Sequence, residues 1–156
     1  MSIATHRFSN EEYHQRFTEG DKVELIDGLI YDKMVIGPKH RSAVNKLIKI
    51  FVLAGYDVSS QGPISWPGNE PEPDLTILAA GTDPTDRHPL PNECLLVIEV
   101  SDASLAKDRE VKLPAYQQAG IRTWIVNLQD DVFEIDGRKT KTASFDDVTI
   151  NIDDIV

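Results

Sequence analysis

The stretch Cys94-Leu95-Leu96-Val97-Ile98-Glu99-Val100 is a run of apolar residues that contains one carboxylate, Glu99, near its C-terminal end. A run this apolar is typical of a β-strand that is buried on both faces of an α/β sheet. An ionised carboxylate in that setting is costly unless it is paired with a cation, bound to a metal or open to solvent. The run therefore predicts an α/β protein and makes Glu99 a candidate functional residue.

Two other charged residues lie near this strand in the predicted arrangement. Asp74 stands at the head of a second apolar segment, residues 73–78, and Lys112 lies in a helix expected over 108–119. The start of one antiparallel strand lies beside the end of its neighbour. If the two apolar segments pair in this way, Asp74 and Glu99 lie at the same edge of the sheet.

Asp74, Glu99 and Lys112 form a combination with a specific chemistry. Two carboxylates a few ångströms apart repel each other, and a hard cation such as Mg²⁺ relieves that repulsion through bonds of about 2.0–2.1 Å. Lys112 is about one turn into its helix, so its long side chain can reach back over the strand end. The combination predicts a site that holds a divalent cation against a phosphate.

The composition is that of an ordinary globular protein. A chain of 156 residues with 40% hydrophobic content is most simply one domain, residues 1–156. The single cysteine, Cys94, excludes an intramolecular disulfide, and the first residues contain no apolar signal segment. No apolar run approaches the ~18 residues that cross a bilayer. We therefore expect a cytoplasmic protein without a membrane partner.

The charge of the chain is strongly negative and uneven. The net charge is −10, and residues 130–156 contribute eight acidic residues against three basic ones. This balance argues against nonspecific coating of nucleic acid, which normally requires a basic face. It does not exclude DNA binding, because a metal site without its cation also adds formal negative charge.

Hydrophobic periodicity and turn signals predict the order of elements. Ser9 and Glu12 form a capping box for a first helix, and Pro114 predicts a kink or a late start in the helix over 108–119. The strand–helix–strand unit over 94–127 predicts a right-handed crossover between parallel neighbours. The other predicted elements are a hairpin of 22–26 and 29–34, an amphipathic helix over 38–54, strands at 56–60, 74–78 and 122–127, and a closing hairpin of 132–135 and 140–144.

This pattern resembles the PD-(D/E)XK nuclease superfamily. The matching motif is Pro73-Asp74 on one strand and Glu99-Val100-Ser101 on the next, within a helix, three strands, a helix and a strand. More narrowly, residues 20–135 resemble the Uma-type putative restriction endonuclease family of bacteria. The segments that carry this narrower resemblance are Glu24-Leu25-Ile26-Asp27-Gly28, His40, Pro73-Asp74-Leu75, Leu96-Val97-Ile98-Glu99-Val100-Ser101, Lys112, Tyr116, Gly120 and Thr123-Trp124-Ile125-Val126.

The resemblance implies a restriction-endonuclease-like core over about 20–135. In this α/β (α+β) fold, helices flank a mixed central sheet, with added N-terminal and C-terminal hairpins. One position departs from the superfamily pattern. The usual lysine lies two residues after the glutamate, where this chain has Ser101. In the Uma-type pattern the following helix supplies the lysine, and Lys112 matches that position.

The resemblance also implies roles for individual residues. Asp74, Glu99 and Lys112 would be catalytic. Asp74, Glu99 and the backbone carbonyl of Val100 would bind Mg²⁺, or Mn²⁺ in its place. Two secondary candidates accompany them: Glu24 would complete the metal shell or bind a second ion, and His40 would contact a phosphate from a helix N-terminus, which favours anions.

Each of these residues also has a simpler interpretation. Either carboxylate taken alone is commonly a solvated residue at a strand end. Lys112 could pair with Asp108, one turn earlier on an exposed helix face. Glu24 could face water from an edge strand, and His40 could make an ordinary hydrogen bond at a helix start.

The function expected from the resemblance is Mg²⁺-dependent endonucleolytic hydrolysis of DNA. A homodimer is expected because two copies place two sites on opposite strands. Two alternatives stay open at this point. The acidic surface and Ser101 favour a catalytically inactive nuclease-like fold that acts as a binding or interaction module. The same carboxylates would also serve a metal-dependent hydrolase of another phosphate ester.

Overall fold

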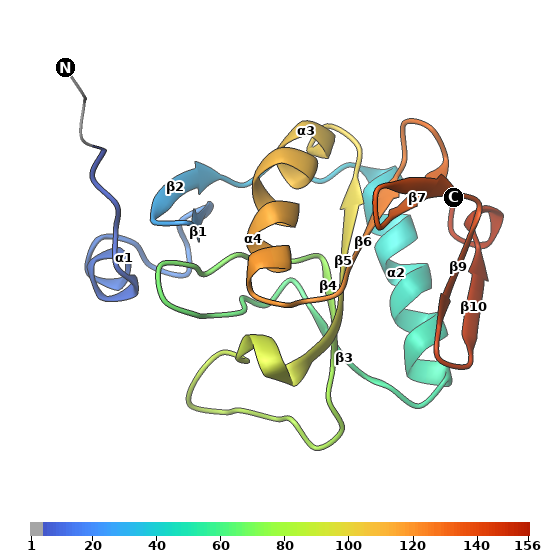
Figure 1. Cartoon of the computed structure of the whole chain (residues 1–156), viewed down its shortest axis with the longest axis horizontal. Helices are drawn as coiled ribbons and strands as arrows, with labels where there is room; N and C mark the ends of the chain where they lie inside the picture. The colour runs from blue at the N-terminus through green and yellow to red at the C-terminus, as the bar shows by residue number, and fades with distance from the viewer. Residues whose placement is uncertain (1–4) are drawn as a thin grey trace.

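A six-stranded mixed sheet forms the centre of the computed structural model, which describes residues 5–156 (Figure 1). Its strand order is β3-β4-β5-β6-β7-β8. The strands are β3 (Asp57–Ser60), β4 (Leu75–Leu78), β5 (Cys94–Ser101), β6 (Thr123–Asn127), β7 (Val132–Ile135) and β8 (Arg138–Thr140). Figure 1 views the sheet nearly edge-on, with α2 (Pro38–Leu53) on one side and α4 (Leu113–Gln118) on the other. These layers confirm the predicted mixed α/β fold.

The pairing of β4 with β5 places the two predicted carboxylates opposite each other. The strands are antiparallel, and Leu75 faces Ile98 in the register. Asp74 directly precedes β4 and therefore lies across from Glu99, as predicted. β5 then runs parallel to β6, as the strand–helix–strand unit predicts.

The helical segment between β5 and β6 differs from the prediction in its start and its winding. It begins at α3 (Leu105–Lys107), continues through the π-helical turn η2 (Asp108–Lys112) and ends in α4. The disturbance expected from Pro114 takes the form of this wide turn. Proline has no N–H and its ring crowds the carbonyl four residues earlier, so a widened turn before it relieves the clash.

Two small elements at the N-terminal side follow their sequence signals. α1 (Asn10–Arg16) begins with the Ser9–Glu12 capping box. β1 (Val23–Ile26) pairs with β2 (Leu29–Asp32) through Asp27 and Gly28, whose φ values of 50° and 76° suit a tight hairpin turn. Leu25 also bridges to Glu70, which ties this hairpin to the loop that leads into β4.

The closing hairpin differs from the prediction. The segment predicted as one strand over 140–144 is divided between β8, which pairs with β7, and β9 (Thr142–Phe145), which pairs with β10 (Val148–Asn151) as a separate ribbon. Ala143 and Phe145 of β9 are buried in the main core. The chain leaves the sheet after β8 because these apolar residues pack against the α2 side.

The two faces of the sheet carry cores of different size. The larger core, on the α2 side, contains Phe51, Trp124 and Phe133, together with the β9–β10 ribbon. The smaller core, under α4, contains Cys94, Val97 and Tyr116. Among residues 5–156, no helix is long and apolar enough to cross a membrane. The smaller core stops short of the C-terminal end of β5, where charged side chains take over.

Candidate active site

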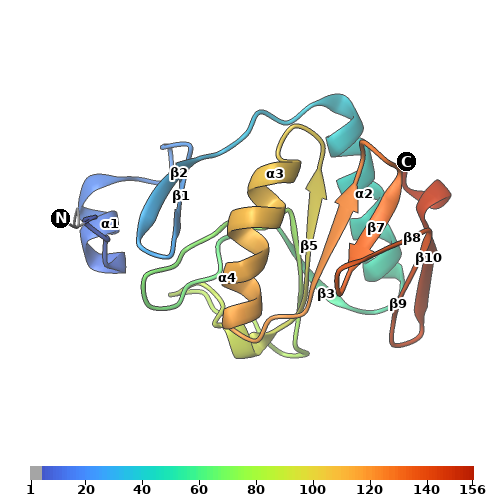
Figure 2. The same ribbon diagram turned by 45° about the horizontal axis from the view of Figure 1, so that its top comes forward.

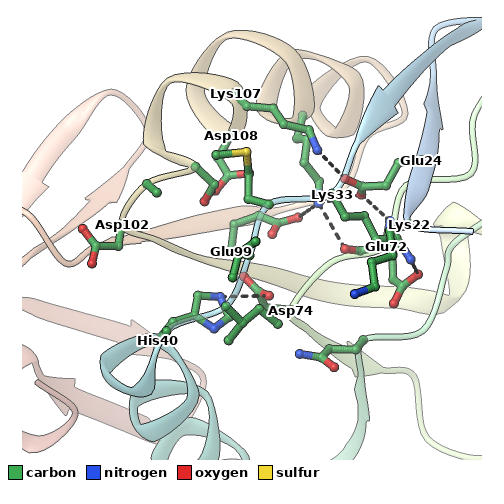
Figure 3. A pocket seen from close by; sticks show the side chains of 18 residues that line it. Lys22, Glu24, Lys33, His40, Glu72, Asp74, Glu99, Asp102, Lys107 and Asp108 are labelled. Atoms are coloured by element: carbon green, nitrogen blue, oxygen red, sulfur yellow. Dashed lines mark hydrogen bonds and ion pairs between the residues drawn. The ribbon is translucent and has the colours of Figure 1, made fainter.

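A cavity of about 610 Å³ lies at the C-terminal end of β5, beside the start of β4 (Figure 3). Its charged lining comes from separate elements: the β1–β2 hairpin, the first turn of α2, the segment before β4, β5 itself, and α3 with η2. The five side chains predicted from sequence all line this cavity: Glu24, His40, Asp74, Glu99 and Lys112.

Lys112 is the centre of one side of the cavity. The residue is only 4% exposed, although it carries an ammonium group. The Nζ atom lies 2.9 Å from Oε1 of Glu24 and 2.8 Å from Oε1 of Glu99. It also donates to the backbone carbonyl of Glu72 at 3.1 Å. These three acceptors match the three N–H donors of a lysine.

Glu24 connects the β1–β2 hairpin to this ammonium group. Its Oε1 accepts the Glu72 N–H at 2.8 Å, and its Oε2 accepts from Lys107 at 2.7 Å. Burial raises the pKa of Glu24, but Lys112 and Lys107 outweigh it and lower the value to about 2. Glu24 is 3% exposed, so its interpretation as a residue facing water is wrong.

Glu99 is held from the helical side. The Tyr116 hydroxyl donates to Oε1 at 2.7 Å, the same oxygen that Lys112 contacts. Burial raises the pKa of Glu99 well above its usual value, and the nearby carboxylates Asp108 and Asp74 add to that increase against Lys112. Burial and the neighbouring carboxylates therefore disfavour the ionised form of Glu99, although Lys112 and Tyr116 both contact it.

Asp74 continues the ladder of hydrogen bonds beyond the start of β4. Its Oδ2 accepts the backbone N–H of Val100 at 2.8 Å, and its Oδ1 lies 3.1 Å from Nε2 of His40. Burial lowers the pKa of His40, but Asp74 outweighs that effect and raises the value above 6.5, with a smaller contribution from Asp108. His40 thus faces a carboxylate from the start of α2.

Asp108 is a buried carboxylate with hydroxyl partners. Ser101 donates to its Oδ2 at 2.6 Å and Ser104 at 2.7 Å. Ser101, which occupies the usual position of the superfamily lysine, therefore fixes Asp108. Lys112 makes no ion pair with Asp108 within the part of the chain that the structure describes, so the exposed-pair interpretation of Lys112 is wrong.

The oxygen donors around Asp74 and Glu99 are of the type that a hard divalent cation prefers. Among residues 5–156, no group of three or more His, Cys, Asp or Glu side chains is placed to hold a metal ion. The predicted set has two carboxylates and one carbonyl, which suits Mg²⁺ because that ion usually keeps several waters. The N–H and C=O of one strand residue point to the same edge, so the Val100 carbonyl faces the edge where Asp74 binds its N–H.

The balance of charge also fits a cation. Six carboxylates line the cavity together with four lysines: Glu24, Glu72, Asp74, Glu99, Asp102 and Asp108 with Lys22, Lys33, Lys107 and Lys112. Burial is the main cause that raises the pKa values of Glu99 and Asp108, and nearby carboxylates add to it. A bound divalent cation would offset the excess of carboxylates over lysines and favour the ionised form of Glu99.

Three residues that build the site carried no predicted catalytic or metal-binding role. Lys107 binds Glu24, Asp108 binds the two serines, and Tyr116 binds Glu99. Tyr116 belonged to the family resemblance without an assigned function. The spacing of four between Asp108, Lys112 and Tyr116 was a usable signal, because residues at that spacing share a helix face.

This chain matches a known protein family in sequence and a solved structure in fold. The family Uma2, described as "Putative restriction endonuclease", matches residues 10–149. A crystal structure of a putative nuclease belonging to DUF820 from Anabaena variabilis is similar in fold, with a TM-score of 0.72 and 10% sequence identity. That likeness covers 95% of this chain and 97% of the other. No curated protein matches this chain.

Proposed function

We propose that this chain, which belongs to the Uma2 family of putative restriction endonucleases, hydrolyses phosphodiester bonds of DNA with a divalent cation. Mg²⁺ is the cation we propose, and Mn²⁺ could take its place. The observation that carries the proposal is the position of Asp74 opposite Glu99 at the mouth of a cavity, with Lys112 against Glu99. Carboxylates from paired strands and a buried lysine suit metal-assisted attack on a phosphate.

The chain's own residues divide the work. Asp74, Glu99 and the Val100 carbonyl would hold the cation, which when bound polarises the phosphate and lowers the pKa of an attacking water. Lys112 keeps Glu99 in place and offsets negative charge as it develops in the transition state. His40 contacts Asp74 from the start of α2, where it would also meet a phosphate.

Glu24 has a different place in this proposal. Both of its oxygens are engaged by lysines, and one also accepts a backbone N–H. Glu24 therefore holds Lys112 and Lys107 in position, and a role as ligand to a second ion would require it to release one of them.

The larger assembly is also part of the proposal. We place the active site in a single domain over 1–156 that acts in the cytoplasm. Two copies of the chain would place two sites on opposite DNA strands, so a homodimer is the assembly we propose for the active enzyme. Sedimentation of the purified protein measures that state directly.

The test is cleavage of supercoiled plasmid with Mg²⁺, Mn²⁺ or a chelator, beside single-stranded DNA and RNA. Asp74→Asn and Glu99→Gln are compared with Asp102→Asn, which removes an exposed carboxylate at the rim of the same cavity. We expect cation-dependent nicking by the natural protein and by Asp102→Asn, and a loss of at least about 100-fold in the other two. Full activity in Asp74→Asn and Glu99→Gln would overturn the site.

One observation favours a second candidate function, an inactive nuclease-like module that binds a partner. All three donors of Lys112 are already engaged by protein acceptors, and Ser101 replaces the usual lysine. The module predicts no cleavage of any of these nucleic acids and no heat of Mg²⁺ binding in calorimetry. The nuclease predicts cation-dependent cleavage and a measurable heat of Mg²⁺ binding.

A further inference from the structure

The positive charge of this acidic protein is concentrated around one helix. The net charge is −10, yet the chain has no acidic residue between Asp32 and Asp57. Five of its 16 basic residues lie in that interval, four of them on α2: Lys33, Lys39, Arg41, Lys46 and Lys49. A segregation of this kind is typical of a surface that meets a polyanion.

The side chains of α2 sort onto two opposite faces. Ala43, Val44, Leu47 and Phe51 are buried against the sheet. The other face forms an exposed basic stripe that lines one open groove: Pro38, Arg41, Ser42, Asn45, Lys46 and Lys49. Their spacing of three or four residues keeps them on one side of a helix about 24 Å long.

The cations of the basic stripe are free of acidic partners. Within the described residues 5–156, Arg41, Lys46 and Lys49 make no ion pair. Lys39 lies off the stripe, donates to the Leu128 carbonyl at 2.8 Å and stands 3.6 Å from Asp131. The charge of the stripe is therefore available to a ligand.

The stripe leads to the candidate active site. Gly37 and His40 line the cavity, and Pro38 and Arg41 line the basic groove, so the two meet across the first turn of α2. In Figure 2, α2 begins near the end of β5 and runs toward the β9–β10 ribbon. At that far end, Asp146 and Asp147 accept hydrogen bonds from Tyr56.

We infer that the basic stripe of α2 binds the sugar–phosphate backbone of duplex DNA and leads it to the cavity. The inference rests on the proposed function for its ligand. A polyanion is attracted to the cationic face, repelled by the acidic turn at the far end, and so held toward the end of α2 that borders the cavity. Asn45 and Ser42, between the cations, add neutral donors of the kind that contact phosphates.

A second copy of the chain is a poorer occupant of this surface. A two-fold contact centred on the stripe would place one basic stripe against another, and like charges repel. A two-fold contact that pairs each stripe with acidic residues of the other copy is a separate outcome, which the test detects as a change of oligomeric state in the α2 variant.

The test is the salt dependence of binding, measured by fluorescence anisotropy with a labelled 20-base-pair duplex in Ca²⁺. Arg41→Gln/Lys46→Gln/Lys49→Gln is compared with Arg138→Gln/Lys139→Gln/Lys141→Gln, which removes the same charge from exposed positions on and beside β8. We expect the α2 variant to lower the slope of log K against log salt by about two to three and to weaken binding at low salt at least tenfold. The β8 variant keeps the natural slope.

The outcomes separate this inference from the proposed function. Equal slopes for the natural protein and the α2 variant would overturn the basic stripe even if plasmid cleavage depends on Asp74. The expected slopes without any cleavage would support the stripe and count against the nuclease. A natural protein that does not bind the duplex, or an α2 variant that changes only the oligomeric state, would overturn the inference.

Discussion

The cavity at the end of β5 has two sides that differ in how their charges are satisfied. Around Lys112, each charged group is buried and bonded to a partner from another element. We call Glu24, Glu99, Lys112 and Tyr116 the Lys112 cluster. On the other side, Asp74 and His40 contact each other with side chains that are 15% and 11% exposed.

This difference separates what holds the site together from what is open to a ligand. Removing one partner of a buried ion pair leaves an uncompensated charge in a low-dielectric setting, which costs several kcal/mol. Losing a partner at a partly exposed pair costs less, because water replaces it. The Lys112 cluster therefore affects stability and activity together, whereas Asp74 offers a route to activity alone.

The largest effect on stability is expected for Lys112→Ala. It leaves Glu24 and Glu99 buried without their shared cation, so we expect the free energy of unfolding in urea to fall by about 3–5 kcal/mol. Arg109→Ala is the matched control on the same turn, because Arg109 pairs with Glu134 at a more exposed position. The control should lose at most about 1 kcal/mol. Equal losses in the two variants would show that the buried ion pairs of Lys112 contribute no more to stability than a more exposed pair.

The second effect concerns pH and Glu24. Its pKa is lowered from 4.5 to about 2, so its ionised form stabilises the fold above pH 4.5 and that stabilisation is lost as the pH falls toward 2. The difference in unfolding free energy between the natural protein and Glu24→Gln should shrink by roughly 3 kcal/mol between pH 5 and pH 2. Glu99, with its raised pKa, works in the opposite direction. Urea titrations at a series of pH values measure the difference, and a constant difference would contradict the role of the lysines.

The third effect separates activity from stability at Asp74. In Asp74→Asn the amide oxygen can still accept the Val100 N–H, but the negative charge is lost. We expect cleavage to fall at least about 100-fold, or about 2.7 kcal/mol in the barrier, while the unfolding free energy changes by less than about 1 kcal/mol. Single-turnover cleavage and urea denaturation of the same preparation test both halves. A loss of stability as large as that of Lys112→Ala would show that Asp74 holds the fold together in the same way as the Lys112 cluster.

The smallest effect is expected for Tyr116→Phe. The ring stays in the smaller core, and only the hydroxyl that donates to Glu99 is removed. We expect a loss of about 1–2 kcal/mol in unfolding free energy, since Lys112 still contacts the same oxygen. Tyr13→Phe serves as a comparison, because its hydroxyl donates to a backbone carbonyl outside the cavity. A larger loss in Tyr13→Phe would contradict the ranking.

The local features of the fold were predictable because they rest on short-range rules. Alternation along strands placed Asp74 opposite Glu99, and the Asp-Gly turn and capping box located their elements. The β9–β10 ribbon was not predicted, because its turn at Asp146-Asp147 contains no glycine although Asp146 has a φ of 50°. A positive φ at an aspartate leaves little trace in a sequence.

The contacts of the Lys112 cluster were harder to predict for a different reason. Glu24 and Lys112 meet only because the β1–β2 hairpin lies against η2, and no periodicity reports that docking. From the sequence, Glu24 lies on a strand of an isolated hairpin and is expected to face water. The structure buries it, so that expectation was wrong. The basic stripe was present in the sequence as an interval without acids, but the net charge of −10 obscured it.

Lys112 is the last residue of the π-helical turn η2, so the direction of its side chain depends on the number of residues that precede it in the helix. In an α-helix each residue advances by about 100°, so one residue more or fewer before Lys112 would turn its side chain away from Glu99. A lysine on a strand has no such freedom, because it can only alternate between two faces. A chain that takes its lysine from a helix can therefore retune the site by a single insertion or deletion, and the exposed Glu110 within η2 is a position where such a change would act.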